Sequence, residues 1–252
     1  MSPVLRFTCI GCGRDVPGVH DGALPFRCPW ARPGDDIDHV VVDTRDARAL
    51  DAPDEDPNPF VRYRRRLSWW RLGTERGLTD GELIDVARSF DEAVARVDGR
   101  GFVVTPFRRC PRLSDDFGAG PDGGVWVKDE TGNVSGSHKG RHLGGVLLFL
   151  LVIQHLRERG LLRTPAGRDL ADRVSQSTFA IASCGNAALA AGVLARAAGF
   201  RLQVFVPTSA EPSIVERLRN LRAEVVVCPR RDDERGVPAY LRFWQALAGW
   251  AV

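Results

Sequence analysis

Lysine is almost absent from this sequence, and so are long apolar stretches. Lys128 and Lys139 are the only lysines among its 35 lysine and arginine residues. The longest apolar run covers residues 146–153, far short of the roughly 20 residues needed to span a bilayer. The N-terminus lacks an apolar signal region, and the formal net charge of +3 is too small to indicate nucleic-acid binding. We therefore expect a soluble, cytoplasmic protein that binds neither membrane nor nucleic acid.

The 252 residues, 44% of them hydrophobic and 27% charged, suit a globular protein of one or two domains. Three regions differ in composition. Residues 1–43 are rich in Pro and Gly and hold three of the six cysteines, which indicates a small Cys-rich, zinc-ribbon-like segment. Residues 44–104 read as a linker followed by a helical connector. Residues 105–252 alternate between strand-like and helix-like patterns and are predicted to form an α/β domain.

The connector contains one clear helix signal and one basic run. A helix is predicted over residues 80–97, because apolar residues recur on one face. These residues are Leu83, Ile84, Ala87, Phe90 and Val94. The basic run at 62–66 is interpreted either as a solvated face or as the ion-pair partner of the acidic residues 54–56.

Residues 105–252 predict an α/β fold with a parallel sheet and flanking helices, because strands and helices alternate with short connections. Strands are expected at 125–127, 178–183, 203–206 and 224–227. Helices are expected at 143–156, 186–198, 213–221 and 239–250. Ligands of such sheets bind beyond the carboxyl ends of the strands, so the loops at these ends are the candidate sites.

The first such loop, residues 128–141, is rich in Gly and Ser and contains Lys139. Lys139 falls at the start of an apolar helix. There the partial positive charge of the helix N-terminus disfavours an ammonium group, and we expect partial burial to act in the same direction. A neutral amine is what Schiff-base chemistry requires. Taken alone, the segment reads first as a surface loop whose lysine meets solvent.

The second loop is a turn of small residues after the strand at 178–183, with Asn186 at the start of the next helix. Such a turn directs backbone N–H groups beyond the strand end and suits a carboxylate or phosphate. The amide of Asn186 can both donate and accept hydrogen bonds. Taken alone, Asn186 also suits an ordinary helix N-cap.

Together the two loops resemble those of the fold type II pyridoxal-phosphate enzymes, the tryptophan synthase β and threonine synthase superfamily. The shared order is a strand, a Gly/Ser loop, Ser-His-Lys, a buried helix, and then a strand followed by Ser-Cys-Gly-Asn. Thr105-Pro106-Phe107 is similar to the early Thr-Pro-Leu segment of that family. The resemblance covers residues 105–252 and is closest to threonine synthase-like proteins. His138 departs from them and is more like tryptophan synthase β, because threonine synthases usually have Phe before the lysine.

The resemblance implies roles for individual residues. Lys139 would form the internal aldimine with pyridoxal 5′-phosphate and later take the α-proton of an amino-acid substrate. His138 and Asn186 would contact the cofactor, Asn186 at its 3′ oxygen. The substrate α-carboxylate would bind the small-residue turn, at Ser183, Cys184 and Gly185. Arg141 and His142, just past the lysine, are expected to have polar roles on the helix surface.

The implied activity is a threonine synthase-like lyase reaction, by elimination or replacement at the β or γ carbon of an amino acid. A serine or threonine dehydratase and a β-replacement synthase are the enzymatic alternatives. A non-catalytic, zinc-binding remnant is the alternative from another functional class.

The family's second half is not visible in the sequence. It carries a Gly-rich loop for the cofactor phosphate and a Ser, Thr or Cys that faces the pyridine nitrogen. No Gly-rich run occurs after Gly199, and the last Ser or Thr of the sequence is Ser213. The last predicted helix carries exposed apolar residues that need a packing partner. They are Leu241, Phe243, Trp244, Leu247 and Trp250. We therefore expect an incomplete tryptophan synthase β-like domain, which is either the N-terminal portion of a larger enzyme or one half of a split one. In the second case a separate chain would supply the C-terminal half; a homodimer is the other expected assembly.

The N-terminal segment has the pattern of a metal site. Cys9 and Cys12 form a Cys-x-x-Cys knuckle, and Cys28 follows. A zinc ribbon would have a second such pair, but the corresponding position here is alanine. His39, or alternatively His20, would complete a Cys₃His site for structural Zn²⁺. Threonine synthase-like proteins often begin with a comparable segment. Reduced thiols and a disulfide remain the alternatives.

Overall fold

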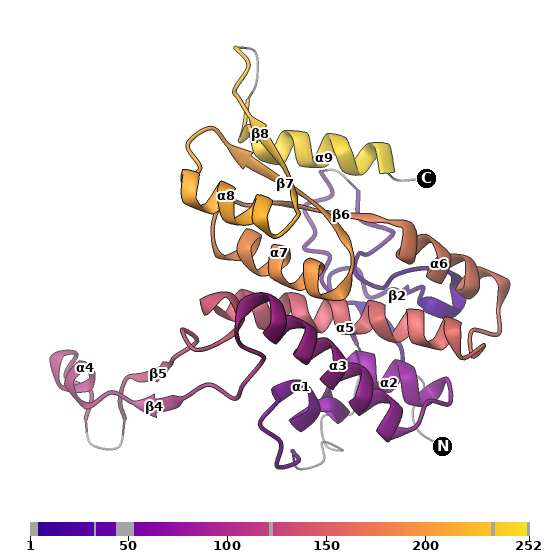
Figure 1. The fold of residues 1–252 in the computed structure, drawn as a ribbon, viewed down its shortest axis with the longest axis horizontal. Coiled ribbons are helices and arrows are strands. Elements are labelled where there is room, and N and C mark those ends of the chain that lie inside the picture. Colours follow the sequence, from indigo (N-terminus) through magenta and orange to yellow (C-terminus); the bar gives the residue numbers. More distant parts are fainter. Residues whose placement is uncertain (1–4, 33, 44–52, 121–122, 233–234, 251–252) are drawn as a thin grey trace. The chain divides into compact units, whose positions relative to one another are not determined.

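The computed structural model describes residues 5–32, 34–43, 53–120, 123–232 and 235–250, with side chains up to residue 246 (Figure 1). The chain divides into two compact units that interleave along the sequence. The first unit comprises residues 1–56, 60–90 and 145–178, and the second comprises 57–59, 91–144 and 179–252. The division into three sequence regions stays a prediction.

The first unit opens with a three-stranded antiparallel sheet in the order β2-β1-β3. Its strands are β1 (Phe7–Cys9), β2 (Asp15–Val16) and β3 (Val41–Asp43), and the 3₁₀ helix η1 (Val19–Asp21) follows β2. Phe7 pairs with Val16 on one side and with Asp43 on the other. The buried core of this segment is small, formed by Cys9, Val16 and Cys28. Strands of two or three residues are too short to show an alternation of apolar and polar residues in the sequence.

Helices make up the rest of the first unit, and three of them, α1, α3 and α5, have residues in both units. They are α1 (Pro59–Arg62), η3 (Arg64–Arg66), α2 (Ser68–Glu75), α3 (Asp80–Asp98), α5 (His138–Glu158) and α6 (Pro165–Gln176). The predicted helix at 80–97 is confirmed by α3. The Thr79 hydroxyl accepts from the Glu82 N–H, and the Glu82 carboxylate accepts from the Thr79 N–H, which forms a capping box.

The apolar helix α5 is buried as predicted, although it begins earlier, at His138. Leu148, Leu150 and Ile153 point in different directions around the helix, and all are 0% exposed. Phe149 contacts the ring of Phe26 edge-on, with 5.4 Å between ring centroids. No helix in the described part of the chain combines the length and the apolar character that crossing a membrane requires.

The basic run at 62–66 includes one buried arginine, Arg64, whose side chain is 6% exposed. Its guanidinium donates to both carboxylate oxygens of Asp80, at 2.7 Å each, and to the carboxylate of Asp54. The interpretation of this run as an ion-pair partner of the acidic residues is therefore confirmed for Arg64 and Asp54.

The second unit is built on a three-stranded sheet in the order β6-β7-β8. The strands are β6 (Thr178–Ala182), β7 (Arg201–Pro207) and β8 (Glu224–Cys228), joined by α7 (Asn186–Ala198) and α8 (Pro212–Asn220). β7 and β8 pair in parallel, from Gln203 opposite Glu224 to Pro207 opposite Cys228. This pairing and the α/β character confirm the coarse fold prediction.

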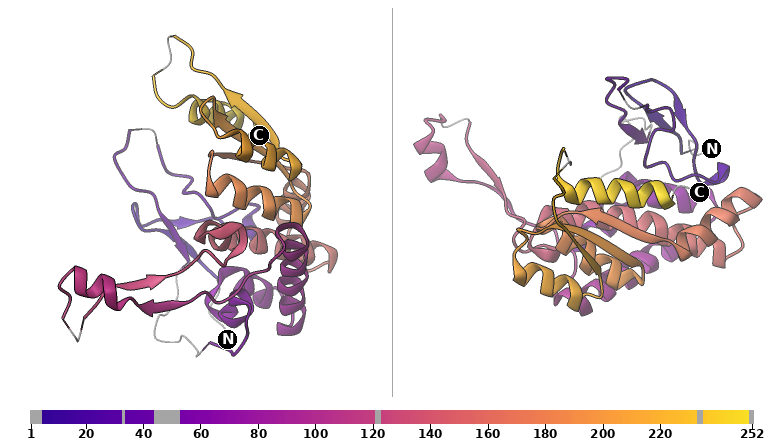
Figure 2. Two further views of the ribbon diagram at one scale, coloured as in Figure 1. Left: turned by 60° about the vertical axis from the view of Figure 1, so that its left-hand side comes forward. Right: turned by 90° about the horizontal axis from the view of Figure 1, so that it is seen from above.

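Helices cover both faces of this sheet. α7 and α8 lie on one face, and α9 (Pro238–Trp250) lies on the other (Figures 1 and 2). Phe205 packs with Ala239 of α9 and contacts the ring of Phe243, whose centroid lies 6.3 Å away. Phe243 therefore has a packing partner within the chain, contrary to the expectation of an exposed face. Trp244 is 55% exposed, and the side chains of Leu247 and Trp250 lie outside the described residues.

The second unit also contains an antiparallel pair of strands that the sequence did not predict as a pair. β4 (Phe107–Arg109) and β5 (Trp126–Lys128) flank the short helix α4 (Pro111–Asp116) (Figure 2). The rings of Phe107 and Trp126 stack across the pair, with centroids 5.3 Å apart. The 3₁₀ helix η4 (Val134–Gly136) then leads into α5.

Candidate functional site

The loop before Lys139 makes a tight turn that ends at the first residue of α5. Ser135 (φ 55°) and Gly136 (φ 68°) are both in the left-handed region, which is unusual for serine. Gly140 approaches the backbone closely, because a Cβ placed there would lie 2.7 Å from the carbonyl oxygen of Val134. These two features fix the path of the chain on either side of Lys139.

Lys139 is the second residue of α5, so the expected position at a helix N-terminus is observed. The expectation of partial burial is wrong, because the side chains of Lys139 and of the preceding His138 are both exposed. The buried polar groups near Lys139 come instead from the loop that precedes it.

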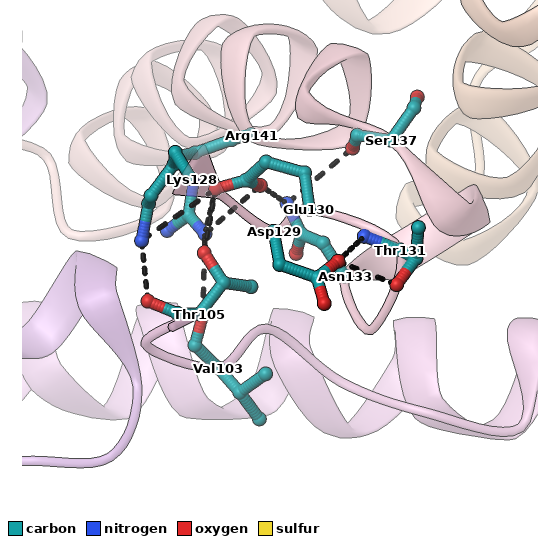
Figure 3. A network of polar contacts seen from close by, with 9 residues as sticks. All are labelled: Val103, Thr105, Lys128, Asp129, Glu130, Thr131, Asn133, Ser137 and Arg141. Atoms are coloured by element: carbon teal, nitrogen blue, oxygen red, sulfur yellow. Dashed lines mark hydrogen bonds and ion pairs between the residues drawn. The ribbon is translucent and has the colours of Figure 1, made fainter. Parts of the chain in front are cut away.

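Glu130 is the centre of a polar network that holds this loop (Figure 3). Its carboxylate accepts hydrogen bonds from the Thr105 hydroxyl at 2.6 Å and from the Asn133 amide at 2.8 Å. Arg141, one turn into α5, donates to both carboxylate oxygens at 3.2–3.3 Å and to the Thr105 hydroxyl. The ammonium of Lys128 lies 3.7 Å from the same carboxylate and donates to the backbone carbonyl of Thr105. The network therefore ties the loop to the start of α5.

The environment of Glu130 keeps its carboxyl group charged. Burial by itself would raise the pKa, but the hydrogen bonds from Thr105 and Arg141 and the charge of Arg141 outweigh burial and lower the pKa of Glu130. Thr105, from the predicted Thr-Pro-Phe segment, is 3% exposed and belongs to this network. Arg141 makes ion-pair and hydrogen-bond contacts near the helix surface, as expected.

Three buried polar atoms in the same loop have no hydrogen-bond partner among the described residues. They are Asn133 Oδ1, Ser135 Oγ and Ser137 Oγ. Leaving such atoms unpaired is costly, so their grouping within the five residues 133–137, which end two positions before Lys139, favours a polar ligand at this loop. A pyridoxal phosphate, with its phosphate and ring hydroxyl, has the donors and acceptors to satisfy them. The residues present therefore fit that cofactor.

The second loop lies at the start of α7. Gly185 is the N-cap of this helix, and Asn186 is its first residue, with an exposed side chain. The reading of Asn186 as an ordinary N-cap is therefore wrong. Ser183 and Gly185 are half-buried and Cys184 is exposed. The Ser183 hydroxyl accepts from the Gly185 N–H at 3.4 Å. The N–H groups of the first turn of α7 have no partner within the helix.

The two loops come together within the second unit, because α7 packs against η4, the turn before Lys139. The sequence predicted both segments but not this contact. Glu130 could not be singled out from the sequence either. Its hydrogen bonds involve Thr105, which is distant in sequence, and Arg141, which lies on α5. Its presence in the Lys128–Arg141 loop was the only available signal.

The predicted metal ligands also come together, within the first unit. The ligand atoms of Cys9, Cys12, Cys28 and His39 all lie within 4.8 Å of one another. The cysteines are free rather than joined in a disulfide. Burial alone would raise the pKa of Cys9, but hydrogen bonds from Cys12, His39 and Gly11 lower it to about 6. The alternative ligand His20 is exposed and lies next to Arg76 instead.

The α/β unit has a lysine at a helix start and unpaired polar groups before it. These features together fit a cofactor-binding enzyme domain. Comparison with known families gives the assignment. Residues 100–244 match the family described as "Pyridoxal-phosphate dependent enzyme". The match covers more than half of the chain, so this protein belongs to the fold type II pyridoxal-phosphate-dependent enzymes.

Two curated relatives share the name "Probable D-serine dehydratase". The protein from Paracidovorax citrulli is 36% identical over 149 residues, which are 55% of this chain and 32% of the relative. That from Rhizobium leguminosarum bv. trifolii is 38% identical over 112 residues, which are 41% of this chain and 25% of the relative. The chain thus spans about a quarter to a third of the length of these relatives. Among solved structures, Escherichia coli diaminopropionate ammonia lyase in its apo form is 19% identical, with a TM-score of 0.41; the match covers 80% of this chain and 47% of that chain.

Proposed function

We propose that this chain contributes the lysine-bearing part of a pyridoxal-phosphate-dependent lyase that eliminates a group from the β carbon of a small hydroxy amino acid. The observation that carries the proposal is the set of unpaired, buried polar atoms at Asn133, Ser135 and Ser137, directly before Lys139. The names of the curated relatives favour a serine dehydratase over the threonine synthase-like activity that the sequence suggested.

Lys139 is proposed to hold the cofactor covalently through Nζ and, once released, to move the α-proton of the substrate. When bound, pyridoxal phosphate supplies the electron sink for that proton transfer. Asn133, Ser135 and Ser137 would offer polar atoms to the cofactor. His138 and Asn186 are proposed to line it as well. The exposed position of Lys139 leaves its amine free to reach a ligand outside the loop.

The substrate carboxylate is proposed to bind at the turn of Ser183, Cys184 and Gly185. The N–H groups of the first turn of α7, which a helix leaves without partners of its own, and the partial positive charge at the start of this 13-residue helix favour an anion there. The side-chain amide of Asn186 is exposed beside those N–H groups and can donate to an oxygen atom.

We further propose that a second polypeptide, either a separate chain with the remaining family residues or another copy of this one, completes the site. This sequence spans at most 32% of the length of the two D-serine dehydratase relatives described above. Light scattering of the purified chain tests the homodimer. Co-purification of a tagged chain from its own cells tests the separate partner.

The proposed role of Lys139 is tested by adding pyridoxal phosphate to the purified chain, reducing with borohydride and mapping the modified peptide. We expect reduced cofactor on Lys139 and none on Lys128, whose ammonium is occupied by Glu130 and Thr105. Lys139→Arg is the matched variant, because it keeps the positive charge but lacks a primary amine. Equal labelling of both lysines, or no labelling, would contradict the proposal and favour the non-catalytic remnant.

A further inference from the structure

The N-terminal segment holds four potential metal ligands at the separations that a tetrahedral ion requires. Cys12 Sγ lies 3.8 Å from Cys28 Sγ, and His39 Nδ1 lies 3.2 Å from Cys28 Sγ and 3.4 Å from Cys9 Sγ. Tetrahedral zinc with its usual bond lengths places two sulfurs about 3.8 Å apart, and a sulfur and a nitrogen about 3.6 Å apart. The observed distances agree with this geometry to within a few tenths of an ångström.

The backbone around the cluster is built to bring these ligands together. Gly11, inside the Cys-x-x-Cys knuckle, lies directly against the segment that carries His39. A Cβ at Gly11 would lie only 2.2 Å from the carbonyl oxygen of Asp38. The N–H of Ile10 donates to the carbonyl oxygen of Val40 at 2.9 Å, which joins the knuckle to the residue after His39.

Asp35 orients the histidine. Its carboxylate lies 2.8 Å from His39 Nε2, on the side of the ring opposite the cysteines. Asp35 is itself held by the N–H groups of Arg32, at 2.9 Å, and Ile37, at 3.2 Å. An imidazole that donates from Nε2 to a carboxylate presents the lone pair of Nδ1, and this arrangement is common behind metal-bound histidines.

We propose that Cys9, Cys12, Cys28 and His39 bind one structural Zn²⁺ ion, with Asp35 as the residue that positions His39 to coordinate through Nδ1. Four protein ligands fill a tetrahedral shell and leave no open position for catalysis. Cysteine thiols release their protons on binding, and three thiolates with one imidazole favour zinc over the hard ions Mg²⁺ and Ca²⁺.

The ion also explains how so small a segment stays folded. Among the described residues, its buried cluster comprises Cys9, Val16 and Cys28, and segments of about 40 residues usually need a metal, disulfides or a partner to fold. All of these residues lie outside the family-matched residues 100–244. The proposed zinc site can therefore be tested independently of the proposed lyase activity.

The test uses the full chain purified without added metal or chelator. We expect about one zinc per chain by elemental analysis. After exchange with Co²⁺, we expect the visible absorption of a tetrahedral site and a thiolate-to-metal band in the near ultraviolet. The cobalt spectrum reports on wild-type protein, so it decides the question even if ligand variants fail to fold. Absence of both zinc and the cobalt bands, or a mass lower by two hydrogens that reveals a disulfide, would overturn the proposal.

Variants then assign the ligands. Cys12→Ser should remove the thiolate contribution of that residue and lower the metal content, whereas the matched control Cys184→Ser, an exposed cysteine outside the cluster, should not change it. Asp35→Asn should keep the metal but weaken zinc affinity about 10- to 100-fold in a chelator competition. An unchanged affinity in Asp35→Asn would refute the positioning role, and unchanged metal content in Cys12→Ser would refute the ligand set.

Discussion

At the scale of single residues, Glu130 makes more polar contacts than any other side chain in the loop before Lys139. We expect Glu130→Gln to lower the free energy of unfolding by about 1–3 kcal/mol at pH 7, because Arg141 and Lys128 lose an anionic partner. Urea unfolding of the cofactor-free chain measures this. Glu158→Gln is the control, since Glu158 is 74% exposed and its ion-pair partner among the described residues is His155, and it should change stability by less than about 0.5 kcal/mol.

The effect of Glu130→Gln on stability should also depend on pH. The pKa of Glu130 is lowered in the folded chain, because its hydrogen bonds and Arg141 outweigh burial. Such a group stabilises the fold above its unfolded pKa of about 4.3 and loses this contribution as the pH falls through the folded value. The stability difference between wild type and Glu130→Gln should therefore be full at pH 7 and shrink below about pH 4. A difference that grows in acid would contradict this assignment.

Ser137 allows a ligand role to be separated from a structural one. Its hydroxyl is buried and unpaired among the described residues, so without cofactor it costs desolvation and returns no hydrogen bond. Ser137→Ala should therefore leave the unfolding free energy of the cofactor-free chain unchanged, or raise it by up to about 1 kcal/mol, yet weaken the binding of pyridoxal phosphate. Equilibrium dialysis measures the binding. Ser175→Ala, which alters an exposed hydroxyl far along the sequence, should affect neither, and a Ser137→Ala chain that binds normally would refute the ligand role.

At the scale of secondary-structure elements, the turn between β1 and β2 has no room for a side chain at Gly11. Gly11→Ala would force Cβ against the carbonyl oxygen of Asp38, which should displace the knuckle from His39, lower stability by about 1–3 kcal/mol and reduce bound zinc. Gly120→Ala is the matched control, because nothing lies within 4 Å of a Cβ there. Thermal unfolding and zinc content measure both effects. Full zinc content in Gly11→Ala would show that the close approach is not required.

Elements with strong local signals were predictable from the sequence, and those set by distant contacts were not. α7 was predicted at its observed bounds, because an Ala-rich run ends at Gly199, which adopts φ 75° as a left-handed helix stop. β4 could not be predicted, because a three-residue segment becomes a strand only through its pairing, here with β5. The same holds within the candidate sites. The ligand types of the Cys/His cluster were visible in the sequence, but the support of Asp35 behind His39 and the hydrogen bonds to Glu130 depend on how the chain folds.

At the scale of the whole molecule, the proposed zinc site and the β6-β7-β8 sheet belong to different compact units. Each has its own core, formed around Cys9 and Cys28 in the first case and around Phe205 and Cys228 in the second. Regions with separate cores open independently when one of them loses its stabilising contacts. We therefore expect removal of zinc to loosen residues 7–43 while leaving β7 and β8 protected.

Hydrogen–deuterium exchange read by mass spectrometry checks this prediction. A strong chelator should accelerate amide exchange in peptides from residues 7–43 and leave peptides covering residues 201–228 unchanged, since the parallel pairing of β7 with β8 involves no zinc ligand. Zinc added in excess should restore the slow exchange, which separates metal loss from irreversible damage. Faster exchange in both regions would mean that the metal stabilises the chain as one cooperative unit. The two cores would then be coupled through elements such as α3 and α5, which contribute residues to both units.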